Sequence, residues 1–461
     1  MSGNNSARSL SNGLSRRSLL KLAGAGALAI PALAACSGGG GGGGGGGFAA
    51  VDIKVPEKYR KRSQKVVLWS SWNGKPGNLL NNLLNKFNDS QDEIYAQAQF
   101  QGNYFDATSK VTAALRAKSV PDIMAFGQTA WQIFFLNETL EELDSYADDA
   151  FTSSFYPNLL NAGVIKNKLY WVSFARSTPI MYYNKNLFAK AGLPDRGPKT
   201  WTELREWGPA LINQKAAGKP VKATELSGGD SWEFEASVWQ FGGRISNGLD
   251  VTVNKGGAVE CADWMRKLIF EDKMAILTRD YGTNFNNGLV GTYMNSTGAL
   301  SGTYEAAKFD VGVSPLPTQV THGVPTGGGG LSIFKGIPKE RKEAAWEVIK
   351  FLSSPESAAT WSLGTGYLPV VKEAVNRSEY KTALDKDPNR GVAVAQLAQA
   401  GKLDEVDAYV QNASPIIYAG LQKIYGDNQP AQQVLDSVAE QLKAGEEKIK
   451  AKYDKLVGDE G

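Results

Sequence analysis

Two apolar segments, Val66-Val67-Leu68-Trp69 and Asp122-Ile123-Met124-Ala125-Phe126, decide the fold of this chain. Between them, residues 79–87 place leucines and a phenylalanine on one helical face, residues 94–100 alternate as a strand, and residues 108–118 are helical again. Strands that alternate with helices in this way predict βαβ units and a largely parallel sheet. The fold class is therefore α/β.

The pattern continues along the chain. A threonine with a glutamate three positions later, Thr200 and Glu203, predicts a capped helix start. Further strands are predicted at 169–174, 179–183, 310–313 and 331–334, and further helices at 258–270, 339–352 and 431–453. Two α/β regions with the chain returning between them predict two lobes joined by several crossings.

An export signal precedes this body. Ser15-Arg16-Arg17-Ser18-Leu19-Leu20-Lys21 is followed by an apolar run over 22–35, which is short for a membrane span. The paired arginines resemble a twin-arginine export signal. Leu33-Ala34-Ala35-Cys36 resembles a bacterial lipobox, which implies cleavage before Cys36 and acylation of that cysteine. An uncleaved membrane anchor is the alternative.

A tether follows the cysteine. Gly38 to Gly47 are ten consecutive glycines, which favour a flexible coil because they have no side chains to bury. Residues 37 to about 62 would then span roughly 25–30 Å. The chain has two cysteines, Cys36 and Cys261. Lipidation of Cys36 would leave Cys261 as an unpaired, buried thiol; a disulfide between the two is the alternative.

The charge balance disfavours a nucleic-acid partner. Of the 50 basic residues, four lie in residues 1–35, which hold no acidic residue, so 46 basic and 47 acidic residues remain in the rest of the chain. A nearly neutral body attracts no polyanion.

Little in the sequence predicts chemistry. His322 is the single histidine, so a zinc site built from histidine and cysteine is excluded and a Ser-His-Asp triad lacks its motif. Gly327 to Gly330 are not followed by the Lys-Ser/Thr of a phosphate-binding loop, and no cofactor is expected. The enzyme alternative is a glycoside hydrolase, which needs only two carboxylates. We expect no enzyme.

From residue 66 onward the body resembles the extracellular solute-binding proteins of ABC importers, the family that includes maltose-binding protein. It looks closest to the glycerol-3-phosphate-binding subgroup. The motifs that carry the resemblance are Trp69-Ser70-Ser71-Trp72, Gly102-Asn103-Tyr104, Ser177-Thr178-Pro179-Ile180-Met181-Tyr182-Tyr183-Asn184-Lys185, Phe188-Ala189-Lys190-Ala191-Gly192-Leu193, Pro198-Lys199-Thr200-Trp201, Gly327-Gly328 and Gly364-Thr365-Gly366-Tyr367-Leu368-Pro369.

The resemblance implies two lobes that close over a ligand by hinge motion, with chain crossings near 181–184, 288–291 and 334–338. The expected division is a signal peptide at 1–35, the lipidated cysteine and tether at 36–62, lobe 1 at 63–181 with 290–335, and lobe 2 at 182–289 with 336–461. The ligand contacts that the subgroup implies here are Tyr104, Ser177, Ser296, Gly328 and Tyr367, with Trp232 at a shared tryptophan position.

Two departures from the subgroup concern the ligand. Gln128 stands at an acidic contact position, and Tyr418 stands where the subgroup has the arginine that grips the phosphate. A tyrosine hydroxyl supplies neither the charge nor the paired N–H groups of arginine. The expected ligand is therefore a carbohydrate, such as a disaccharide or small oligosaccharide. The alternative is glycerol-3-phosphate or a glycerophosphodiester.

Aromatic residues support the carbohydrate prediction, because sugar C–H faces lie flat on rings. Six of them lie near predicted strand ends and loops, where ligands of open α/β sheets bind: Trp69, Trp72, Tyr104, Trp232, Trp239 and Tyr367. Trp232 lies in the loop-like stretch 228–233. Three polar residues, Arg176, Asp230 and Glu233, are candidates for hydrogen bonds to the ligand, with surface exposure as the alternative.

The sequence thus predicts a monomeric substrate-binding lipoprotein, anchored by lipid at the extracellular face of the cytoplasmic membrane. Its partners are a carbohydrate and the membrane subunits of an ABC permease.

Overall fold

The computed structural model describes residues 48–227, 231–278 and 281–458. The chain divides into two compact units, Met1–Gly46 and Gly47–Gly461, and the described residues all belong to the second. The predicted export signal, the lipidation site Cys36 and the glycine tract up to Gly47 lie outside the described residues.

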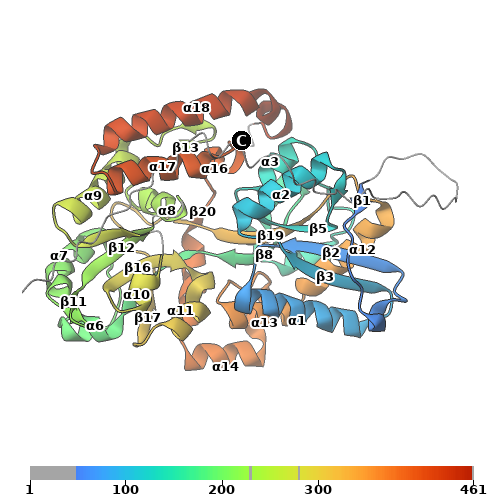
Figure 1. Cartoon of the computed structure of the whole chain (residues 1–461), viewed down its shortest axis with the longest axis horizontal. Coiled ribbons are helices and arrows are strands. Elements are labelled where there is room, and N and C mark those ends of the chain that lie inside the picture. Colours follow the sequence, from blue (N-terminus) through green and yellow to red (C-terminus); the bar gives the residue numbers. More distant parts are fainter. Residues whose placement is uncertain (1–47, 228–230, 279–280, 459–461) are drawn as a thin grey trace, which may run out of the picture. The chain divides into compact units, whose positions relative to one another are not determined.

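The first sheet confirms the predicted βαβ pattern (Figure 1). Its strand order is β3-β2-β5-β19-β8. β2 pairs in parallel with β3 and β5, whereas β19 runs antiparallel to β5 and β8. The strands are β2 (Gln64–Ser70), β3 (Ile94–Phe100), β5 (Ile123–Gly127), β8 (Val172–Ser177) and β19 (Gly327–Ile333). The connections are α1 (Gly74–Ser90) and α2 (Tyr104–Arg116).

The second sheet has the order β15-β12-β16-β9-β17. β12 is parallel to β15 and β16, and β9 is antiparallel to β16 and β17. The strands are β9 (Pro179–Asn184), β12 (Lys222–Ser227), β15 (Ala275–Thr278), β16 (Val290–Ser296) and β17 (Val311–Ser314). Residues 290–335, predicted as part of lobe 1, are thus divided: β16 and β17 join the second sheet because they pair with β9, and β19 joins the first.

The helices cover the two sheets separately. α12 (Lys339–Leu352) packs on β2 and β19, and α13 (Pro355–Thr365) packs on α1. On the second sheet, α7 (Trp201–Ile212) packs on β12, and α8 (Trp232–Gln240) packs on α9 (Gly256–Phe270). α17 (Ala413–Tyr425) and α18 (Ala431–Leu456) pack on each other and on α9.

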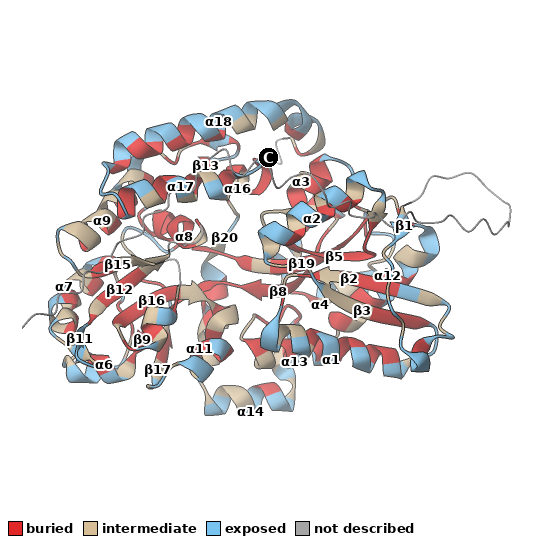
Figure 2. Ribbon diagram, in the orientation of Figure 1, coloured by how far each residue is buried: buried red, intermediate tan, exposed pale blue. Residues whose placement is uncertain are grey.

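Burial follows the predicted helical periodicity. Val434, Leu435, Val438 and Leu442 turn one face of α18 inward, and its outer face is exposed (Figure 2). Cys261 lies in the core between α9 and α17, as expected of a structural thiol, and burial raises its pKa well above the usual value.

The crossings between the sheets differ from the prediction at two places. Residues 288–291 make no crossing, because β15 and β16 on either side of them both belong to the second sheet. The chain crosses at Thr178, between β8 and β9, and again within 315–326, between β17 and β19. The predicted crossing near 334–338 is wrong, because the next helix, α12, packs back on the first sheet. Among the helices of the described ranges, none combines the length and apolar character needed to span a bilayer.

Candidate functional site

The predicted site residues gather at the carboxyl ends of the parallel strands, where ligands of open α/β sheets bind. Trp72 follows β2, Tyr104 begins the helix after β3, and Gln128 follows β5. Ser177 ends β8, and Ser296 ends β16 of the second sheet. Sheet topology thus brings together residues that are far apart in the sequence.

The beginning of β19 forms the floor of the site. Gly327 is paired with Ser177, and Gly328 with Arg176. Gly328 has a φ of +88°, and a Cβ atom there would lie 1.9 Å from the carbonyl oxygen of Ala175. Only glycine fits this close backbone approach. A Cβ at Gly329 would lie 2.6 Å from the hydroxyl of Tyr104, so the tyrosine ring rests directly on the strand.

An aromatic cluster lies beside this floor. The ring of Trp72 meets those of Tyr104 and Trp361 at centroid distances of 6.4 and 5.4 Å, and Trp361 stacks on Tyr367 at 5.9 Å. Burial raises the pKa of Tyr104 well above its usual value, so its hydroxyl stays protonated. The Tyr104 hydroxyl and the Trp72 indole N–H make no hydrogen bond of good geometry within the described chain. Buried polar groups of this kind are normally satisfied, and a ligand can do so.

Arg176 is buried at the end of β8, with none of its surface exposed, so the surface alternative is wrong. Its Nη2 donates to Gln128 Oε1 and Thr326 Oγ1, each at 2.7 Å, and its Cζ lies 4.9 Å from the ring centre of Trp171. Burial lowers the pKa of Arg176 to about 9, which still leaves it charged at neutral pH. Within the described residues no carboxylate forms a salt bridge with it, and its Nε and Nη1 make no hydrogen bond.

Trp232 begins α8 and reaches β19 of the first sheet. Its indole Nε1 donates to the carbonyl oxygen of Thr326 at 3.1 Å. A Cβ at Gly327 would lie 2.4 Å from the Trp232 ring and 2.9 Å from Ser177 Oγ. Trp232 therefore lies against the floor of the site, in a helix instead of the predicted loop. Asp230 lies outside the described residues.

Ser296 joins the site through its neighbours. Its Oγ accepts a hydrogen bond from the backbone N–H of Gly298 at 3.0 Å, and a Cβ at Gly298 would lie 2.7 Å from the Tyr367 ring. The residue after that tyrosine, Leu368, donates its backbone N–H to the carbonyl oxygen of Arg176 at 2.7 Å. Tyr367 is thereby fixed between the ends of β8 and β16.

Tyr418 is the site residue with the weakest connection. It is half-buried on α17, one helical turn after Ser414, whose hydroxyl accepts from Ser231 Oγ at 2.7 Å. Residues four apart share a helix face, so Tyr418 lies on the side of α17 that faces the start of α8. Two nearby arginines in the sequence are candidates to replace the phosphate-binding arginine of the subgroup, but each already pairs with an acid: Arg377 with Glu379 and Arg390 with Asp387.

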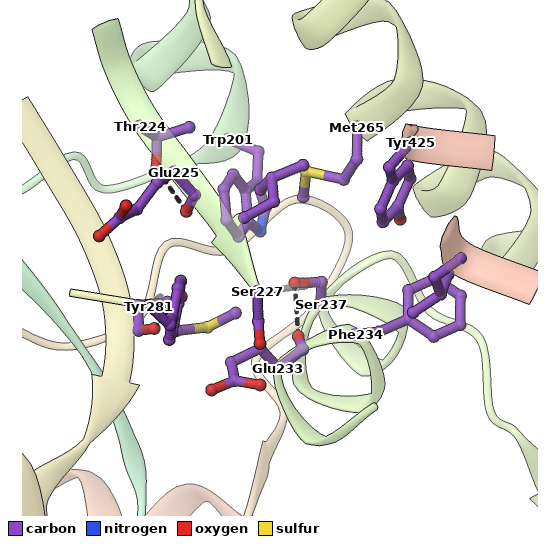
Figure 3. Close-up of a pocket in the computed structure, with 13 residues that line it drawn as sticks. Trp201, Thr224, Glu225, Ser227, Glu233, Phe234, Ser237, Met265, Tyr281 and Tyr425 are labelled. Atoms are coloured by element: carbon purple, nitrogen blue, oxygen red, sulfur yellow. Dashed lines mark hydrogen bonds between the residues drawn. The ribbon is translucent and has the colours of Figure 1, made fainter. Parts of the chain in front are cut away.

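A small cavity beside α8 is a packing feature. It offers about 30 Å³ among the side chains of Trp201, Phe234, Met265 and Tyr425, with Glu233 at its edge (Figure 3). That volume holds about one or two waters and is too small for a solute. Glu233 is buried, so its exposure alternative is also wrong.

Thr326 is a site residue that was not predicted. Its carbonyl oxygen accepts from both Gln128 Nε2 and Trp232 Nε1, and its hydroxyl accepts from Arg176. The sequence signal was a single polar residue before a glycine run, which is common in loops. In the described ranges, no group of three or more His, Cys, Asp or Glu side chains is placed to hold a metal ion.

Comparison with known proteins finds relatives that cover most of the chain. The profile of the bacterial extracellular solute-binding proteins matches residues 82–392. The sn-glycerol-3-phosphate-binding periplasmic protein UgpB of Salmonella paratyphi A is 28% identical over 403 residues, which cover 81% of this chain and 91% of that protein.

Two crystal structures share the fold. UgpB from Mycobacterium tuberculosis, in complex with glycerophosphocholine, is 31% identical with a TM-score of 0.78 and covers 83% of this chain and 98% of its own. The GacH receptor of Streptomyces glaucescens, solved unliganded and with acarbose, is 20% identical with a TM-score of 0.73. This match covers 87% of this chain and 100% of the GacH chain. The chain therefore belongs to the bacterial extracellular solute-binding proteins of ABC importers, in the glycerol-3-phosphate-binding subgroup.

Proposed function

We propose that this solute-binding protein captures a neutral carbohydrate and delivers it to the membrane subunits of its importer. The observation that carries the proposal is a pair of buried polar groups, Tyr104 Oη and Trp72 Nε1, which lie within an aromatic cluster and make no hydrogen bond of good geometry in the described chain. A sugar offers hydroxyl groups to both and places C–H faces on the rings. The protein acts by binding alone, which the solute-binding relatives support, and the glycoside hydrolase alternative has no motif behind it.

Capture follows from the position of Trp232. The two sheets carry the two lobes, and Trp232 belongs to α8 of the second while Ser177 and Gly328 belong to the first. Closure brings the indole over the ligand, with Gln128, Ser177 and Ser296 supplying hydrogen bonds. Binding near micromolar affinity would need about −8 kcal/mol, which stacked rings and several hydrogen bonds can supply.

A second candidate ligand is glycerol-3-phosphate or a glycerophosphodiester, and Arg176 is the observation that favours it. This buried cation has no acidic partner in the described chain. A phosphate would neutralise it and would replace the charge absent at Tyr418. The related UgpB that was solved with glycerophosphocholine supports the same alternative. Against it, Nη2 of Arg176 is already engaged by Gln128 and Thr326.

We further propose that the chain is exported, cleaved before Cys36, and held by lipid at the extracellular face of the cytoplasmic membrane as a monomer. The lipobox-like 33–36 and the glycine tract that follows support this location. The tether would let the body reach its permease.

A thermal-shift screen tests the ligand class, using the chain from residue 36 onward with Cys36→Ser. The probes are glucose, maltose, glycerol-3-phosphate and glycerophosphocholine. A ligand at 100 times its dissociation constant adds about 2.7 kcal/mol of stability. A shift with saccharides alone supports the carbohydrate proposal. A shift with the phosphate compounds alone refutes it and assigns the charge to Arg176.

A further inference from the structure

The C-terminal helix α18 belongs to both lobes. It has 26 residues and is therefore about 39 Å long, at 1.5 Å per residue. Its first half packs on α9 and α17 of the second lobe, and Figure 1 shows it continuing toward α3 (Trp131–Leu136), which follows β5 of the first lobe. We propose that α16 (Glu405–Tyr409) and residues 452–458, together the clasp, hold the lobes closed over the solute and detach from α3 when the lobes open. The inference rests on capture between two lobes and on no particular class of ligand.

The two ends of α18 are held unequally. In its first half, six residues are buried in the core of the second lobe: Ala431, Val434, Leu435, Val438, Ala439 and Leu442. At the other end, Tyr453 and Val457 are buried in the cluster that includes the first sheet. A helix is stiff over this length, so a rotation of the lobes has to detach one end. Because buried apolar area sets most of the stabilisation, the C-terminal end is the weaker attachment and detaches first.

Two hydrogen bonds join the end of α18 to the first lobe. Lys452 Nζ donates to Oδ1 of Asn137, which ends α3, at 2.9 Å. Lys166 Nζ, in the turn after β6 (Val164–Ile165), donates to the carbonyl oxygen of Lys455 at 3.2 Å. The last carbonyl groups of a helix lack a partner within it, so a lysine from the other lobe is a favourable cap. The donors and Asn137 are exposed, so water competes for both bonds and the contact can be released.

α16 moves with the second lobe. It packs on α18 and α3, and the rings of Tyr409 and Tyr453 meet edge to face at 5.1 Å. The hydroxyl of Tyr453 donates to Glu405, which joins the two parts of the clasp. Just before α16, the buried carboxylate of Asp404 accepts from Trp239 Nε1 of α8 at 2.8 Å. The clasp is thus tied to the second lobe and rests on the first.

A cavity shows on which side of the hinge the clasp acts. It measures about 360 Å³, and its walls include Gln128 and Thr326 of the site together with Tyr409 and Val457 of the clasp. Thr326 ends the crossing at 315–326, so the cavity separates the clasp from this crossing. Rotation of the lobes about the crossing widens the cavity and pulls the clasp away from α3. A permanent interface would be packed like a protein interior, whereas this one encloses space.

The test changes the charge at Asn137, an exposed position, so that the core is left intact. Asn137→Lys places a second cation beside Lys452, and Asn137→Asp forms an ion pair with it. Both substitutions are repeated in Lys452→Ala, where the charge at position 137 should make no difference. The matched control places the same two charges at Asn376, another exposed asparagine at the end of a short helix of the first lobe, the 3-10 helix Lys372–Asn376.

Pulsed EPR measures the separation of the lobes without any ligand. Spin labels are attached at Lys110→Cys, on α2 of the first lobe, and at Lys255→Cys, before α9 of the second, in a Cys36→Ser protein. Both label positions are exposed, and the remaining thiol, Cys261, is buried. We expect Asn137→Lys to shift the distance distribution toward longer values and Asn137→Asp to shift it toward shorter ones.

Calorimetric titration with maltose and with glycerophosphocholine gives the second measurement. For whichever compound binds the parent, Asn137→Lys should raise the dissociation constant about two- to fivefold and Asn137→Asp should lower it as much, which is the range of an exposed ion pair. Equal results for the two charges at Asn137, differences that persist in Lys452→Ala, or the same differences at Asn376 overturn the clasp. Failure of both compounds to bind the parent counts against the proposed ligands, and the EPR distances then decide the clasp by themselves.

Discussion

Gly327 and Gly328 are neighbours in β19, and replacing each by alanine should have opposite effects on stability and on ligand binding. At Gly328 the new methyl group meets the backbone oxygen of Ala175 at 1.9 Å, and φ is +88°. At Gly327 it meets only side chains, the Trp232 ring at 2.4 Å and Ser177 Oγ at 2.9 Å.

The magnitudes follow from these contacts. For Gly328→Ala, a left-handed backbone costs about 1–2 kcal/mol. Overpacking against a fixed carbonyl costs about 1–3 kcal/mol more. The free energy of unfolding should therefore fall by about 2–5 kcal/mol. For Gly327→Ala, displacing Trp232 loses one hydrogen bond to Thr326, about 0.5–1.5 kcal/mol, while the stiffer unfolded chain returns about 0.4–1 kcal/mol. The net change in stability should stay within about 1 kcal/mol of zero.

Urea unfolding measures the free energy of unfolding. Calorimetric titration measures ligand binding, with the saccharide that raises the melting temperature of the parent protein. Gly327→Ala should weaken binding tenfold or more, because the methyl group takes the place of the Trp232 ring beside Ser177. If Gly327→Ala lost as much stability as Gly328→Ala, Trp232 would be a fixed core residue and the binding argument would fail. A neutral Gly328→Ala would refute the backbone contact.

Three further predictions concern single residues. Trp232→Ala should weaken saccharide binding with little change in melting temperature, whereas Trp264→Ala, which removes a partly buried ring packed against the core, should do the reverse; equal loss of melting temperature would return Trp232 to the core. Burial and the nearby carboxylates Asp404 and Asp407 raise the pKa of Glu235 well above its usual 4.5. The folded state therefore keeps a proton that the unfolded state has already lost, and the free energy of unfolding falls as pH rises from about 4.5 through the raised pKa. Glu235→Gln should flatten this part of the curve of urea midpoint against pH, and an unchanged slope would mean that Glu235 is already ionised. Cys36→Ser should move the protein from the membrane to the soluble fraction of fractionated cells, and continued membrane attachment would instead support an uncleaved anchor.

Much of the fold could be predicted because its signals are local. The helix at 339–352 and the strand around 66–69 were found from periodicity, which short-range packing imposes. The site residues after β2, β3 and β5 could be placed because parallel strands end at one edge of a sheet. Which sheet each strand joins was harder to predict. β16 and β17 join the second sheet by pairing with β9, and no local sequence pattern encodes this pairing.

The polar centre of the site could not be predicted. Arg176 bonds to Gln128 and Thr326, which lie 48 and 150 residues away along the chain. An arginine surrounded by serine and threonine is ordinarily exposed, and only the antiparallel arrival of β19 covers it. Trp232 was misplaced in a loop because the glycines before it conceal the start of α8.

The carbonyl oxygen of Thr326 links the two lobes. A carbonyl oxygen has two lone pairs, and both are used here, by Gln128 and Trp232. Gln128 follows β5 of the first sheet, whereas Trp232 begins α8 beside the second. A swing of the second sheet therefore carries Trp232 away and breaks its bond to Thr326, while the bond from Gln128 stays within the first lobe, so opening removes one of the two hydrogen bonds and closure restores it.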